Sequence, residues 1–241
     1  MRYAILSDVH ANREALEAVL ADAAPRADAV LSLGDAVGYG ADPIACLELL
    51  AERAHATVAG NHDHAVAGLL DTSWFNPRAA AAVEWTREQL DDDYRAWLGG
   101  RPLILELGDA TLVHASPAQP EEWEYLMSAE DGFAVFGAFA TRYCFVGHSH
   151  VPGVWSLGSS GPEHRRGDVG LTAERGRRYL VNVGSVGQPR DHDPRAAYAL
   201  WDADGGEIRI RRVPYDVDAA RRKILAAGLP RFLADRLAVG S

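Results

Sequence analysis

The sequence predicts one domain of the α/β class whose first part contains parallel strands. Residues 1–60 alternate short apolar runs with amphipathic stretches, and this βαβαβ order implies parallel strands covered by helices. The chain has 241 residues, of which 48% are hydrophobic and 24% charged, which is enough for a sizeable core. No stretch rich in proline and serine divides the chain. We therefore expect a single domain over residues 1–241.

The first third of the chain holds three expected strands and two expected helices. The strands are Tyr3–Ser7, Ala29–Leu33 and Ala56–Ala59, and the helices are Arg13–Ala24 and Pro43–Arg53. In the first helix Leu16, Val19, Leu20 and Ala23 recur at helical spacing. The second helix begins with a proline, a residue that suits the first helical turn.

The middle of the chain is more helical, and the end alternates strand and helix again. Helices are expected at His62–Leu69, Pro77–Gln89, Tyr94–Trp97, Glu130–Ala140, Val217–Ala227 and Arg231–Val239. Strands are expected at Leu103–Leu107, Ala110–His114, Cys144–Val146, Tyr179–Val183, Ala197–Asp202 and Glu207–Arg212. Residues 158–178 are polar and rich in glycine, serine and arginine, so they predict a long loop.

Composition argues against several classes of protein. The formal net charge of −10 argues against a broad nucleic-acid-binding face, which would need a basic stripe. No apolar run approaches the roughly 20 residues that a membrane span requires. Cys46 and Cys144 cannot make a disulfide framework, which favours a reducing compartment. We therefore expect a cytoplasmic protein that binds neither long nucleic acid nor membranes.

Residues capable of binding metal follow five of the predicted strands. They are Asp8 and His10 after the first strand, Asp35 after the second, Asn61, His62 and Asp63 after the third, His114 at the end of the fourth, and His148 and His150 after the fifth. The carboxyl ends of strands in an open α/β sheet converge on one crevice, so these side chains can meet there. Carboxylate, imidazole and amide ligands together suit Mn²⁺, Fe or Zn²⁺, and the absence of cysteine argues against a structural thiolate zinc site. Seven candidate ligands are too many for one ion, which predicts two metals about 3.5–4 Å apart that share a carboxylate.

The order Asp-x-His, Gly-Asp, Gly-Asn-His-Asp, His and Gly-His-x-His resembles that of the calcineurin-like metallophosphoesterase family. The later segment Asn182–Arg190 resembles the closing segment of the small bacterial members. The resemblance implies a four-layer α/β/β/α sandwich of two mixed sheets, with a dimetal site at the carboxyl-terminal edge of the strands. It also implies two divalent ions, Mn²⁺ foremost and otherwise Fe, Zn or Ni. One ion would be held by Asp8, His10, Asp35 and His150, and the other by Asp35, Asn61, His114 and His148, with Asp35 as the bridge.

The resemblance further implies a hydrolase of phosphoric esters. In such a site a hydroxide between the metals attacks phosphorus in line with the leaving oxygen. We expect His62 to act as general acid and Asp63 beside it to be catalytic. The expected substrates are small phosphodiesters or phosphomonoesters, with nucleotides among them. The alternatives are a dinucleoside polyphosphate hydrolase, a protein Ser/Thr phosphatase, and a non-catalytic binding module, which the intact set of site residues argues against.

Three further residues are candidates for substrate binding, and several aromatic residues lie near the motifs. Protein phosphatases of this kind carry an arginine where Tyr39 stands, so we expect Tyr39, Asn12 and Arg190 to contact substrate instead. Two helical insertions, near 69–100 and 115–143, are expected to form a partial lid. Tyr39, Trp74, Phe75, Trp123 and Tyr125 lie in or beside these segments, where they either pack the insertions or stack on a nucleobase. A homodimer is the commonest oligomer and is the expected state of any assembly.

Overall fold

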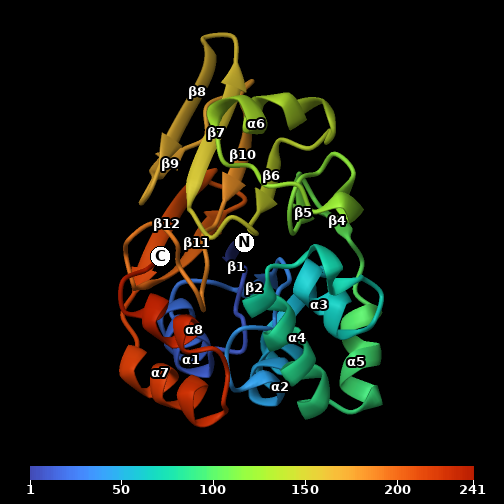
Figure 1. Cartoon of the computed structure of the whole chain (residues 1–241). Helices are drawn as coiled ribbons and strands as arrows, with labels where there is room; N and C mark the ends of the chain where they lie inside the picture. The colour runs from blue at the N-terminus through green and yellow to red at the C-terminus, as the bar shows by residue number, and fades with distance from the viewer.

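A computed structural model describes residues 1–241 and contains two six-stranded sheets (Figure 1). The first sheet has the order β3-β2-β1-β11-β12-β9 and the second the order β4-β5-β6-β10-β7-β8. The strands of the first sheet are β1 (Arg2–Leu6), β2 (Ala29–Ser32), β3 (Ala54–Thr57), β9 (Gly170–Thr172), β11 (Ala196–Asp202) and β12 (Glu207–Val213). Those of the second are β4 (Ile104–Leu107), β5 (Ala110–Val113), β6 (Tyr143–Val146), β7 (Gly153–Gly158), β8 (Gly161–Arg166) and β10 (Arg178–Asn182).

Both sheets are mixed, and the parallel part of each carries the loops that matter for function. In the first sheet β1 is parallel to β2 and β2 to β3, whereas β1 is antiparallel to β11. In the second sheet β5, β6 and β10 are parallel, whereas β7 is antiparallel to β10. The carboxyl ends of the parallel strands of each sheet therefore lie at one edge of that sheet.

The helices surround the two sheets. They are α1 (Arg13–Ala23), α2 (Pro43–Arg53), α3 (Asn61–Val66), α4 (Pro77–Gln89), α5 (Asp92–Gly99), α6 (Ala129–Ala134), α7 (Val217–Ala226) and α8 (Arg231–Leu237), with short 3₁₀ turns η1 (Thr72–Trp74), η2 (Pro120–Glu122) and η3 (Val135–Gly137). Figure 1 shows α6 beside the second sheet, and the other helices gathered at the opposite end of the molecule. None of these helices combines the length and apolar character that crossing a bilayer requires.

Three apolar layers hold the four structural layers together. Alternate residues of β1 point to opposite faces of its sheet, so Ile5 packs between the sheets with Phe145 and Val181 of the second sheet. Leu6 faces the other way and packs with Leu16 of α1. The outer face of the second sheet is covered by α6 and η3, whose cluster has the following members: Val113, Leu126, Val135, Phe136, Phe139, Cys144, Val146, Trp155 and Leu180. The predicted sandwich of two mixed sheets between helices is confirmed.

Most predicted elements lie within one or two residues of their observed bounds, but the predicted loop over residues 158–178 is wrong. Residues Gly153–Gly158 and Gly161–Arg166 form the hairpin β7–β8, and β9 joins the first sheet. β8 is an edge strand whose residues are half-buried or exposed, so it lacks the apolar alternation by which a strand is predicted. The indole of Trp155 stacks on the His164 ring at 4.5 Å across this hairpin.

The packing between the sheets predicts a large loss of stability on truncating Phe145, which is fully buried and lies 5.2 Å from the Trp201 ring. Phe145→Ala should lower the free energy of unfolding by about 3–5 kcal/mol, because it removes buried area and leaves a cavity. Urea denaturation measures the change. The control is Ile104→Ala on β4, where 41% of the residue is exposed. This variant should lower the free energy of unfolding by less than about 1 kcal/mol. Equal losses for the two variants would contradict this account of the core.

Candidate metal centre

The seven predicted metal ligands come together at the shared edge of the two sheets, and all are buried. The ligands after β1, β2 and β3 come from the first sheet, and those after β5 and β6 come from the second. Their donor atoms form two triads, Asp8–His10–His150 and Asp35–His114–His148, in each of which the ligand atoms lie within 4.8 Å of one another. A third triad joins Asp35 to His10 and His62. The structure thus brings together the side chains of the two predicted half-sites, and their role as metal ligands stays a prediction.

Asp35 lies between the half-sites. Its Oδ2 atom is 3.5 Å from Nε2 of His10 in one half and 3.4 Å from Nε2 of His114 in the other. Within the first half, Nε2 of His150 lies 3.2 Å from Oδ1 of Asp8. A carboxylate in this position can contribute an oxygen to each of two ions, as the predicted bridge requires.

Three of the histidines are oriented by backbone carbonyl groups. Nδ1 of His10 lies 3.0 Å from the Val37 carbonyl oxygen, Nδ1 of His114 lies 2.8 Å from that of Leu33, and Nδ1 of His150 lies 2.6 Å from that of Gln188. A proton on Nδ1 satisfies each carbonyl and leaves Nε2 as a free lone pair toward the centre. Metal-binding histidines in proteins use this arrangement, which sets the tautomer and the ring direction.

The donor set suits divalent cations. Oδ1 of Asn61 is buried without a hydrogen-bond partner, which is costly unless an ion or another donor satisfies it. Burial opposes the charge on Asp8, but the neighbouring His150 and His114 rings hold the pKa of its carboxyl below the usual range. Burial also lowers the pKa of His10 and His150, which favours the neutral imidazoles that metals bind. The residues present therefore fit the two predicted ions.

The backbone of the centre is strained. Five of the seven ligands have φ in the left-handed region, namely Asp8 (56°), His10 (48°), Asp35 (52°), His148 (64°) and His150 (59°). This region costs a residue with a side chain about 1–2 kcal/mol. Backbone strain concentrated in this way is a mark of functional sites, where surrounding structure over-determines the geometry.

Two glycines allow the loops of the centre to approach each other closely. A Cβ atom on Gly60 would lie 2.0 Å from Oδ1 of Asp35, and one on Gly147 would lie 1.9 Å from Oγ of Ser7 and 2.5 Å from Oδ2 of Asp8. Any side chain at either position would therefore displace a ligand. This explains why glycine precedes Asn61 and His148 in the sequence motifs.

The carboxylate of Asp63 holds the Asp35 loop in place. Its oxygens accept backbone N–H groups of Asp35 at 2.8 Å, Ala36 at 2.9 Å, Gly60 at 3.0 Å and Val37 at 3.4 Å. Burial and the nearby Asp35 charge raise the pKa of Asp63 to about 7, while the backbone donors act in the opposite direction. These contacts give Asp63 a positioning role, and the catalytic role expected for it stays a prediction.

His62 lies beside both half-sites and is buried. Its ring centroid is 4.9 Å from that of His10, 4.4 Å from that of Tyr39 and 5.1 Å from that of Phe75. Its backbone N–H donates to Oδ1 of Asp35 at 2.9 Å, so its position depends on the same carboxylate as the half-sites. Burial lowers the pKa of the His62 imidazole to about 4. Near neutral pH the ring is therefore neutral and carries one N–H.

Arg190 lies near the centre together with an arginine that the sequence did not predict. Nη2 of Arg190 and Nη1 of Arg236 each donate to Oε1 of Gln188 at 2.8 Å, and the Arg190 guanidinium lies 5.7 Å from the Tyr39 ring. Burial and the adjacent Arg190 lower the pKa of Arg236 to about 10. Arg236 belongs to α8, far along the chain from every motif, and no local pattern pointed to it.

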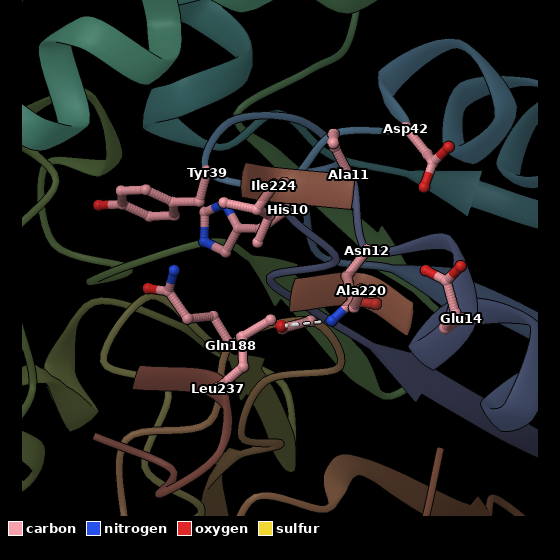
Figure 2. Close-up of a pocket in the computed structure, with 13 residues that line it drawn as sticks. His10, Ala11, Asn12, Glu14, Tyr39, Asp42, Gln188, Ala220, Ile224 and Leu237 are labelled. Carbon is pink, nitrogen blue, oxygen red and sulfur yellow. Dashed lines mark hydrogen bonds between the residues drawn. The ribbon is translucent and has the colours of Figure 1, made fainter. Parts of the chain in front are cut away.

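Asn12 lies at the first turn of α1, and both of its polar atoms are engaged within the protein. Oδ1 accepts the Ala15 N–H at 3.1 Å as the helix N-cap, and Nδ2 donates to the Gly187 carbonyl at 2.8 Å. Figure 2 shows the second bond beside a hollow of about 10 Å³, roughly one water, next to His10 and Tyr39. With both polar atoms engaged, the contact of Asn12 with substrate stays a prediction.

The role of Asp63 predicts a loss of both stability and metal on its truncation. Asp63→Ala should destabilise the fold by about 3 kcal/mol or more, because several buried N–H groups lose their partner. It should also lower the metal content below two ions per chain, measured by elemental analysis after loading.

The matched control for this prediction is Asp131→Ala. Asp131 also accepts two backbone N–H groups, from Met127 and Ser128 at 3.0 and 2.8 Å, but at the exposed start of α6. The Asp131→Ala variant should lower the free energy of unfolding by about 1 kcal/mol and leave the metal content unchanged. Full metal content in the Asp63 variant would contradict the positioning role.

Comparisons with known proteins agree with this geometry. A family model described as a calcineurin-like phosphoesterase superfamily domain matches residues 1–206. The crystal structure of a metallophosphoesterase from Sphaerobacter thermophilus is 44% identical, with a TM-score of 0.87 that covers 100% of this chain and 99% of that one. An uncharacterized protein of Methanocaldococcus jannaschii is 39% identical over 244 residues, which span 98% of this chain and 97% of the relative.

A more distant structure shares the fold. A hypothetical protein from Pyrococcus horikoshii is 21% identical, with a TM-score of 0.80 over 100% of this chain and 98% of that one. With the family match over most of the chain and the two half-sites at the sheet edge, the chain belongs to the calcineurin-like phosphoesterase superfamily and is a metal-dependent hydrolase of phosphoric esters.

Proposed function

We propose that the protein hydrolyses small phosphodiesters or phosphomonoesters, nucleotides among them, at a two-metal centre. The observation that carries the proposal is the pair of ligand triads that meet at Asp35 with His62 alongside. Asp8, His10, Asp35 and His150 would hold one ion, and Asp35, Asn61, His114 and His148 the other. When bound, the two ions supply Lewis acidity and lower the pKa of water near the phosphorus. Mn²⁺ is the proposed metal, and Fe, Zn and Ni are the alternatives that elemental analysis would distinguish.

His62 would donate a hydrogen bond to the leaving oxygen rather than its proton, because its imidazole is neutral near pH 7. Its ring lies beside His10 and Asp35 and lines the cleft that opens next to the centre, so a leaving oxygen on the cleft side of the phosphorus would meet this ring. A neutral imidazole offers one N–H, which can stabilise the negative charge that develops on that oxygen. Arg190, steadied by Gln188, would contact a non-bridging phosphate oxygen with its remaining donors, and Arg236 would add positive potential behind it.

The alternatives are a dinucleoside polyphosphate hydrolase and a protein Ser/Thr phosphatase. Tyr39 occupies the place of the arginine expected in those enzymes, which favours the smaller substrates. A substrate panel tests the choice. Rapid cleavage of a chromogenic bis-ester, with little release of nucleoside diphosphate from a dinucleoside tetraphosphate, is the expected result. The reverse order of rates would favour the polyphosphate activity.

The same proposal extends to partners and location. The net charge of −10 disfavours long nucleic acid, so no retention on duplex DNA at physiological salt is expected. We also propose that the protein works in the cytoplasm without a membrane partner and that any assembly is a homodimer, which the mass in solution would test.

The bridging position of Asp35 predicts the pattern of metal loss among variants. Asp35→Ala should lower the content of both ions and reduce kcat by at least about 1,000-fold, because both half-sites lose a ligand. His148→Ala should lower mainly one ion, and His55→Ala, a variant of an exposed histidine outside the centre, should change neither. Elemental analysis and assay after chelation and reloading measure these effects. Full occupancy in the Asp35 variant would exclude the bridge.

The proposed hydrogen bond from the neutral His62 imidazole predicts that the effect of His62→Ala depends on the leaving group. With an alkyl leaving group, whose oxygen develops a large negative charge, kcat should fall by about 100-fold or more, whereas p-nitrophenolate leaves readily and should lose much less. Metal content should stay at the wild-type level, which separates this effect from ligand loss. Equal losses for both esters would contradict the proposed hydrogen bond to the leaving oxygen.

A further inference from the structure

A cleft of about 830 Å³ opens beside the metal centre. The aromatic side chains that line it are Tyr39, His62, Trp74, Phe75, Trp123 and Tyr125. Asn61 and His148, from the second half-site, also line it, so any group bound in the cleft lies next to the reacting phosphorus. The volume falls within the range of pockets that bind small molecules, roughly 300–1,000 Å³.

Two separate segments form the aromatic walls, and each contacts a residue of the centre. Phe75 follows η1, and its ring centroid lies 5.1 Å from that of His62. Tyr125 follows η2, and its ring stacks on His148 at 3.9 Å with an angle of 21° between the planes. Residues of both segments predicted as a partial lid thus line the cleft, one with an aromatic ring beside His62 and the other with a ring on the predicted ligand His148.

Two tryptophans of the cleft are held in unfavourable states. Trp74 is 90% exposed, although burying a large aromatic side chain is favourable by several kcal/mol, so its ring is free to contact a ligand. Trp123 has φ of 54°, a left-handed conformation that is rare for a bulky residue. Its ring centroid lies 6.0 Å from that of His114. Both tryptophans place an indole at the cleft.

The charge of the cleft excludes one class of occupant and favours another. Asp71, Glu121 and Glu122 line it, and no lysine or arginine does. A second phosphate in the cleft would therefore be repelled, whereas amino and imino N–H groups would find acceptors. The arginines near the centre, Arg190 and Arg236, lie outside this lining.

We infer that the cleft binds a nucleobase on the leaving-group side of the ester. The inference rests on the proposed function, because His62, the proposed donor to the leaving oxygen, is itself part of the cleft lining. The leaving alcohol is then a nucleoside, with its planar base between the aromatic walls and its N–H donors toward the carboxylates. The substrate class is a nucleoside phosphomonoester or phosphodiester with one phosphorus at the centre, not a dinucleoside polyphosphate.

The first test measures base binding without phosphate. Guanosine titrated into the metal-loaded protein should quench tryptophan fluorescence, and ribose should not. The Trp74→Phe variant keeps an aromatic ring but loses one fluorophore. Guanosine should therefore quench less tryptophan fluorescence in this variant, while it still inhibits hydrolysis by competing with the substrate. No quench and no competition by guanosine would overturn the inference whether or not the protein hydrolyses esters.

The second test compares two esters with the same phosphate group. The wild-type protein should hydrolyse guanosine 5′-monophosphate with a higher kcat/KM than ribose 5-phosphate. In Trp74→Ala and Trp123→Ala the ratio of the two kcat/KM values should fall about tenfold, mainly through a higher KM. The reason is that stacking of a base on an aromatic ring contributes about 1–3 kcal/mol to the free energy of binding. Leu69→Ala, at an exposed site of the same segment, is the matched control and should keep the preference.

The outcomes separate the inference from the proposed function. Equal hydrolysis of both esters in every variant would overturn the base site and leave the phosphoesterase function standing. Hydrolysis of neither ester, together with specific quenching by guanosine, would support the base site and overturn the proposed catalysis.

Discussion

The site depends on where the Asp35 carboxylate is held. Its Oδ2 lies between His10 and His114, and its Oδ1 accepts the His62 backbone N–H. Its own N–H donates to Asp63, which also binds Gly60 and so ties the loops after β2 and β3 together. Both half-sites and His62, the proposed hydrogen-bond donor, are thus positioned through one residue. A small displacement of the Asp35 loop would disturb the metal ligands and His62 at the same time.

Such an arrangement is unfavourable by itself and needs a rigid support. Two buried carboxylates lie close together, and five ligands adopt left-handed backbone conformations. The apolar layer between the sheets supplies the support, because its strands end directly beneath the centre. The burial of apolar side chains between the sheets therefore stabilises the fold and also offsets the free-energy cost of the strained, charged centre. Such a centre would not form on a flexible loop. Bound cations would relieve the remaining repulsion between Asp8 and Asp35.

The sequence was sufficient to predict which side chains meet at the centre and insufficient to predict the groups that hold them there. Asp8, Asp35 and His148 follow apolar strands, and strand ends in α/β sheets converge, so their meeting could be predicted. The role of Asp63 could not be predicted, because its partners are backbone N–H groups that gather only in the folded chain. Arg236 lies on a helix that packs against the site from far along the chain, without a local pattern.

The hairpin β7–β8 was not predicted, for a different reason. The side chains of β8 are polar because they face solvent at a sheet edge, and strand prediction relies on an apolar face. For the aromatic residues near the motifs, the sequence suggested positions but could not decide between roles. Their positions beside the motifs suggested two roles, packing or stacking, and only the fold reveals that Trp74 is exposed and that Trp123 and Tyr125 face a cleft.

The distribution of charge explains how a protein with net charge −10 can take an anionic substrate. Arg190 and Arg236 lie on one side of the centre, and the carboxylates Asp71, Glu121 and Glu122 line the cleft on another. An ester that binds with its phosphate at the centre and its uncharged part in the cleft satisfies both sides. An ester that places a second phosphate in the cleft brings this phosphate against the carboxylates. The total charge therefore opposes long polyanions, while the local charges select how a small phosphoester is oriented.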